Sequence, residues 1–88
     1  MKLKTPAGEV EFRALTLRDF DLIERLGRRQ GTGEAIAEII ERSSSGKLKA
    51  KDVMDWPIGA VIEVFARIME LSGISPAEVE RLTSFRAE

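Results

Sequence analysis

Residues 57–72 have the sequence PIGAVIEVFARIMELS, and this stretch decides the fold class of the 88-residue chain. Proline is tolerated in the first turn of a helix and glycine often follows the last, so Pro57 and Gly73 bound one predicted helix. At helical spacing the stretch carries a main apolar stripe and a second stripe beside it. The main stripe consists of Ile58, Val61, Ile62, Phe65, Ile68 and Met69, and the second of Ala60, Val64 and Leu71.

This predicted helix is apolar over most of its circumference, which indicates burial on most sides. In a chain of 88 residues it is either the central helix or an interface helix. Its polar strip is narrow, with Glu63 and Arg67 at the i,i+4 spacing of an ion pair. The surplus apolar surface predicts binding to another protein or to a second copy of the chain.

Two more helices are expected before this one. Thr16 is a good N-cap and Asp19 follows three residues later, as in a capping box, so a helix is predicted from there to about Arg29. Its expected buried side is Phe20, Leu22, Ile23 and Leu26. Thr32 is the expected cap of the next helix, over residues 33–42. Its apolar stripe is Ala35, Ile36, Ile39 and Ile40.

The segments around these helices have weaker signals. Residues 43–46 (SSSG) are expected to form a flexible link, and residues 47–54 a short helical turn. Asp55 is the expected cap of the 57–72 helix, although the start is uncertain by one residue because Trp56 precedes a proline. Ser75, with Glu78 three residues on, predicts a last helix to about Phe85. Its apolar positions are Val79, Leu82 and Phe85.

The N-terminal residues alternate between apolar and charged side chains, which is typical of strands. Val10, Phe12 and Ala14 fall on one face, and the turn is expected over Pro6–Glu9. An isolated hairpin is marginally stable in water, so its apolar face must lie on helices. The prediction is one mainly α domain of four to five helices with an N-terminal β-hairpin. Its expected parts are a hairpin at 1–15, a helical core at 16–72 and a C-terminal helix or tail at 73–88.

The composition excludes much chemistry. The chain has no histidine, cysteine or tyrosine, so it lacks the commonest general base, thiolate ligands and disulfides. Its net charge is −1, although residues 1–51 carry a surplus of basic groups and residues 52–88 of acidic ones. The longest apolar run is interrupted by charges and no export signal precedes it. The expected protein therefore binds no cofactor, does not enter the membrane and resides in the cytoplasm.

Several short patterns resemble functional sites, and each has a stronger structural interpretation. Residues 44–47 (SSGK) match a Ser-x-x-Lys nucleophile pattern but fall in the expected link. The basic, glycine-rich residues 27–33 suit a helix C-terminus better than a phosphate site. Of the two carboxylate pairs, Asp19 and Asp21 point to different helix faces, and Asp52 and Asp55 suit a capping arrangement. Trp56 is expected to be a core anchor, with an interface role as the alternative.

Four sequence features together resemble a known family. They are the KLKTP opening at 2–6, the stretch FRALTLRDFD at 12–21, KDVMDW at 51–56, and the apolar helix closing with LSG at 71–73. In this order they resemble the small tail assembly chaperones of long-tailed bacteriophages. The resemblance covers residues 2–73 and implies a non-enzymatic protein. Such chaperones bind the long helical tape-measure protein and aid assembly of tail-tube subunits around it, here in the host cytoplasm.

The expected binding surface is apolar, because a coiled-coil client exposes apolar seams. Self-association of the chain is a further expectation. Two alternatives remain: a regulatory protein that inhibits a cellular protein, and a nucleic-acid accessory protein that uses the basic first half. The candidate partner-binding residues are Ile36, Ile39, Ile40, Trp56, Ala60, Val64, Leu71, Leu82 and Phe85.

Overall fold

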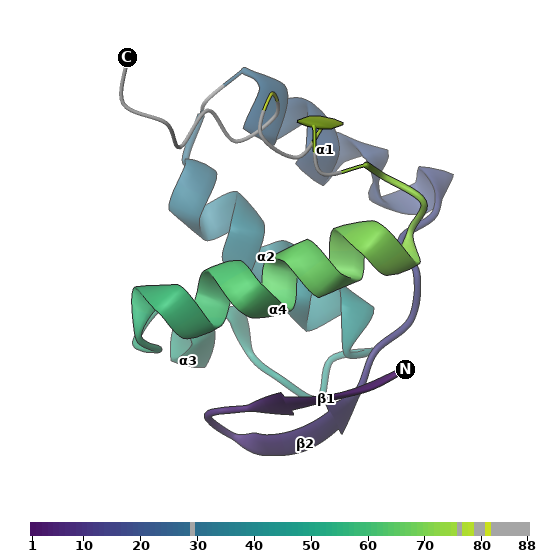
Figure 1. Cartoon of the computed structure of the whole chain (residues 1–88). Helices are drawn as coiled ribbons and strands as arrows, with labels where there is room; N and C mark the ends of the chain where they lie inside the picture. The colour runs from purple at the N-terminus through teal and green to yellow at the C-terminus, as the bar shows by residue number, and fades with distance from the viewer. Residues whose placement is uncertain (29, 76, 79–80, 82–88) are drawn as a thin grey trace.

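A computed structural model describes the chain over residues 1–28, 30–75, 77–78 and 81. This part of the chain is mainly helical with an N-terminal antiparallel hairpin, which confirms the predicted fold class (Figure 1). The strands are β1 (Lys2–Thr5) and β2 (Gly8–Glu11), and a short 3-10 helix, η1 (Leu17–Asp19), follows them. The α-helices are α1 (Phe20–Gly27), α2 (Thr32–Ser43), α3 (Ala50–Val53) and α4 (Ile58–Leu71).

The hairpin turns more tightly than the sequence predicts. Thr5 pairs with Gly8, so only two residues form the corner and Glu9 already belongs to β2. The Thr5 hydroxyl accepts from the Ala7 amide at 3.0 Å and donates to the Gly8 carbonyl at 2.7 Å. Gly8 has a φ of +103°, which glycine adopts without strain.

The second strand ends at Glu11 and does not continue to Leu15 as predicted. The next backbone groups bond to helices. The Arg13 amide donates to the Ser43 carbonyl at 2.8 Å, and the Leu15 amide donates to Ser72 Oγ at 2.8 Å. This segment therefore ties the hairpin to the C-terminal ends of α2 and α4.

The serine-rich segment after α2 is not the flexible link that its composition indicates. Ser43 and Ser44 are almost fully buried. Ser43 Oγ donates to the Arg13 carbonyl at 2.6 Å, while Ser44 Oγ donates to the Glu41 carbonyl at 2.8 Å and accepts from the Leu48 amide at 3.1 Å. Small hydroxyl side chains fit here because they satisfy buried backbone groups at a close approach.

The core lies where α4 crosses α2, with the hairpin below them in Figure 1. It draws on α1, α2, α3 and α4, on Leu48 before α3 and on Phe12 after β2. Its buried apolar residues are Phe12, Leu22, Leu26, Ala35, Ile36, Ala37, Ile39, Ile40, Leu48, Val53, Val64, Phe65, Ile68 and Met69.

Some predicted helix ends are correct and others shift by one or two residues. Gly73 follows α4 with a φ of +84°, and the Ile74 amide donates to the Met69 carbonyl at 2.9 Å, as expected of a glycine stop. Gly31, not Thr32, is the N-cap of α2. Asp55 caps nothing, because α4 begins after an extended Pro57.

The start of the first helix is a capping box between Thr16 and Asp19, as predicted. Its first turn is the 3-10 helix η1, however, and this turn directs Asp19 inward. Phe20 is 51% exposed as a result, although the sequence places it on the buried side.

Asp19 is only 2% exposed, and its side chain contacts three other residues. Its Oδ2 accepts from the Thr16 amide at 2.9 Å and from Arg13 Nη1 at 3.2 Å. Its Oδ1 lies 3.6 Å from Arg42 Nη1, and Arg42 also contacts Asp21 at 3.1 Å. Burial alone would raise the pKa of Asp19. The hydrogen bonds and the two guanidinium charges outweigh burial and hold this pKa below its ordinary value of 3.8.

Replacing Asp19 by asparagine removes this charge. We expect Asp19→Asn to lower the free energy of unfolding by about 2 kcal/mol at neutral pH, the size of the charged hydrogen bonds lost. Because the folded pKa is lowered, the stabilisation is present above the unfolded pKa and is lost as pH falls through the folded one. Urea unfolding followed by circular dichroism at several pH values measures both effects. A difference between wild type and variant that stays constant down to acidic pH contradicts the assignment.

Candidate protein-binding surface

Four of the nine candidate binding residues lie in the core. Ile39 and Ile40 are 0% exposed, Val64 is 3% and Ile36 is 4% exposed. A partner cannot contact side chains at this depth while the domain keeps this conformation. The structure therefore revises the expectation for these four residues, and they belong to the packing between α2 and α4.

Three other candidates are half-buried. Trp56 packs against the edge of the core from the turn between α3 and α4, and Ala60 and Leu71 lie near the two ends of α4. Leu82 and Phe85 fall outside the described residues. The sequence-based set therefore contributes only partly accessible side chains to the surface.

Three exposed apolar side chains at or just before the start of α4 are not among the candidate binding residues. Ile58 is 76% exposed and Ile62 is 41% exposed, one turn apart on the same side of α4. Met54, just after α3, is 53% exposed. We name these three residues the apolar strip. Helical periodicity finds both stripes of α4, but which stripe meets α2 is decided by how the two helices cross.

A hollow adjoins the apolar strip at Met54. It measures about 370 Å³ and lies between α2 and α3. Its floor includes Ala37 and Ala50, and charged side chains surround them. The lining residues are Glu34, Ala37, Glu38, Ala50, Lys51 and Met54. This combination of an apolar floor and a polar rim resembles the anatomy of protein–protein contacts.

A second exposed apolar pair lies at the start of α1. Leu17 is 83% exposed and Phe20 is 51% exposed. The nearby Leu15 amide bonds to Ser72, which follows the last turn of α4. The pair is therefore close to the end of α4 that is opposite the apolar strip, and the two do not form one continuous surface.

Three arginines of the basic first half are paired with carboxylates. Arg25 pairs with Glu38 at 3.2 Å and Arg28 with Glu24 at 3.5 Å. Arg42 pairs with Asp21, and the structure does not describe Arg29. These contacts neutralise several of the charges that a phosphate backbone would need.

The side chains that the sequence offers for catalysis or metal binding either stabilise the fold or lie exposed and apart from one another. Ser44 Oγ is committed to a helix carbonyl and is buried, which does not suit a nucleophile. Asp52 and Asp55 are exposed around the end of α3. In the part of the chain that the structure describes, no group of three His, Cys, Asp or Glu side chains is placed to hold a metal ion. No helix in this part is both long and apolar enough to cross a membrane.

Comparisons with models of known protein families, with curated proteins and with solved structures find no match for this chain.

The contrast between the apolar strip and the core has a direct consequence for stability. We expect Ile58→Gln to change the free energy of unfolding by less than about 0.5 kcal/mol, because an exposed side chain loses little packing. The core variant Ile40→Ala serves as the comparison and should cost about 2 to 5 kcal/mol. Urea unfolding measures both. A loss for Ile58→Gln as large as that for Ile40→Ala would show that Ile58 is packed.

Proposed function

We propose that this chain is a non-enzymatic tail assembly chaperone that binds a phage tape-measure protein and helps tail-tube subunits assemble on it. The family resemblance of residues 2–73 motivates this proposal. The observation that carries the binding role is the apolar strip, where Met54, Ile58 and Ile62 are all more than 40% exposed.

The apolar strip suits a helical client. Ile58 and Ile62 are one turn apart, and a coiled-coil client presents apolar side chains at similar intervals along its seam. Glu63, which follows Ile62 in the sequence, is exposed and supplies a charged group beside the apolar strip. Binding would proceed by helix-to-helix packing, with no bond made or broken.

The affinity expected from this strip alone is modest. Full burial of an exposed isoleucine contributes about 1.5 to 3 kcal/mol, and association itself costs at least about 4 kcal/mol. Two isoleucines and one methionine therefore support weak, reversible binding. A chaperone needs such binding, because it must release its client when tail-tube subunits arrive. Several copies acting along a long client would strengthen the total.

An inhibitor of a cellular protein would use the same apolar strip, so the identity of the client separates that alternative from the proposal. The paired arginines of the first half favour neither a nucleic-acid partner nor a phosphate ligand.

Co-expression with fragments of a tape-measure protein tests the proposal. We expect a fragment to co-purify with the wild-type chain. The double variant Ile58→Asp/Ile62→Asp should abolish the complex, because burial of an unpaired carboxylate opposes association. Leu17→Asp is the matched control, since it places the same charge on an exposed apolar position near the other end of α4, and it should retain the complex.

Circular dichroism must show that all variants remain folded. The proposal fails if no tape-measure fragment binds the wild-type chain, or if the double variant binds as well as the wild type does.

A further inference from the structure

The outer edge of β1 has free hydrogen-bonding groups. Met1 and Phe12 are bonded through their backbones in both directions, at 2.8 and 3.0 Å, and the pairs Leu3/Val10 and Thr5/Gly8 continue this alternation. In an antiparallel pair the intervening residues direct their amides and carbonyls away from the partner strand. These residues are Lys2 and Lys4. No described residue bonds to their backbone groups.

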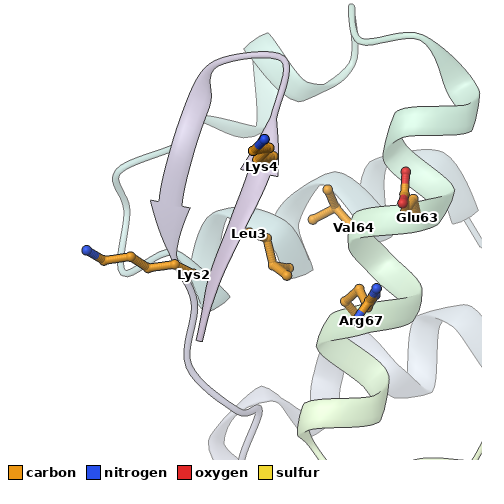
Figure 2. Close-up of a pocket in the computed structure, with 6 residues that line it drawn as sticks. All are labelled: Lys2, Leu3, Lys4, Glu63, Val64 and Arg67. Carbon is orange, nitrogen blue, oxygen red and sulfur yellow. The ribbon is translucent and has the colours of Figure 1, made fainter.

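This free edge borders a groove. A hollow of about 320 Å³ lies between β1 and α4, lined by Lys2, Leu3, Lys4, Glu63, Val64 and Arg67. Figure 2 shows Leu3 directed from β1 toward α4, Val64 directed back toward β1, and Arg67 on the side of α4 that faces the strand. We name this hollow the edge groove. It combines a backbone edge, an apolar floor and a charged rim.

The charges of the edge groove are mostly positive. Lys2, Lys4 and Arg67 outnumber the single carboxylate of Glu63. Glu63 and Arg67 have the spacing of an ion pair, but no contact within 4.0 Å joins them, so the predicted pair does not form. The Arg67 guanidinium therefore has no carboxylate partner among the residues that the structure describes.

The hairpin itself shows which side chains suit the neighbours of these lysines. Lys2 is opposite Glu11 and Lys4 is opposite Glu9 on β2, while Val10 is opposite Leu3. A strand on the other side of β1 would repeat the pattern if it carried acidic residues beside the lysines and an apolar residue beside Leu3. Two residues with free amides and carbonyls offer four backbone hydrogen-bonding groups to such a strand.

We propose that the edge groove binds an extended acidic segment of a partner protein, which adds to the hairpin as a third strand beside β1. Its apolar residues, alternating with the acidic ones, contact Leu3 and Val64. The outer edge of β2 does not compete, because Glu9 and Glu11 repel acidic side chains there. Edge lysines can also serve merely to prevent strands from pairing with other chains, and the experiment distinguishes this role.

A synthetic peptide tests the proposal on the full chain. The probe is acetyl-Thr-Glu-Val-Glu-Val-Glu-Thr-amide, titrated into isotopically labelled protein at low salt. We expect the amide resonances of Lys2 and Lys4 to shift and their hydrogen exchange to slow. Added salt should weaken binding, since the charges are exposed. Two control peptides isolate the interactions: one has lysine in place of glutamate, and one has N-methylated glutamates, whose amides would lie opposite Lys2 and Lys4 and cannot donate. Neither should bind.

Protein variants locate the site. We expect the double variant Lys4→Gln/Arg67→Gln to weaken peptide binding by about threefold or more. It removes two exposed charge pairs with the peptide, and each such pair contributes little to the binding free energy. Lys51→Gln with Lys49→Gln changes the net charge equally at positions outside the edge groove and should leave binding unchanged. Ile58→Gln should also leave it unchanged, which separates this inference from the function proposed for the apolar strip. The inference is overturned if the peptide does not bind, if the N-methylated peptide binds equally well, or if the shifts are confined to other elements. Lys2 and Lys4 would then serve only to prevent the edge from pairing with other chains.

Discussion

The buried carboxylate of Asp19 is the contact on which the arrangement of this fold depends. It joins three parts of the chain: Arg13 from the segment after the hairpin, Thr16 at the start of η1, and Arg42 near the end of α2. A buried carboxylate without partners would cost several kcal/mol, whereas one with this set of donors stays charged. The position of α1 against α2 follows from this junction, as does the inward turn of η1 that leaves Phe20 at the surface.

The hairpin takes its position from the same region. Arg13 and Leu15 bond to Ser43 and Ser72, so the chain after β2 is held at the C-terminal ends of α2 and α4. The hairpin then lies along α4 with β1 as the nearer strand (Figure 1). Because β1 contacts α4 through Leu3 and not through its backbone edge, the edge groove remains between them. The chain is held close to α4 at the C-terminal end of this helix. The backbone groups of Lys2 and Lys4 on β1 therefore stay free beside the middle of α4.

Capping patterns between residues close in sequence predicted much of this fold, but the sequence did not predict which apolar side chains are exposed. The Thr16/Asp19 box, the Gly73 stop and the reciprocal bonds of Ser75 and Glu78 depend on residues three or four apart, and sequence spacing reveals them. Burial of Ser43 depends on Arg13, thirty positions away. Composition indicated a link there, because serine is typical both of loops and of tight helix contacts. The exposure of Ile58 likewise depends on where α2 crosses α4, which no periodicity records.

The apolar strip and the edge groove lie on the same helix but select different chemistry. Ile58 and Arg67 are nine positions apart, which is about 14 Å along a helix axis and about half a turn around it, so the two surfaces face different sides of α4. A connection between them must also pass around the helix, so it needs more than the about four or five extended residues that cover 14 Å. A client that has both an apolar helical seam and an acidic extended segment would engage both surfaces through a connection that passes around α4. Each contact alone is weak, and the first binding event raises the local concentration for the second. Salt would loosen the acidic contact and spare the apolar one, so release could proceed one surface at a time.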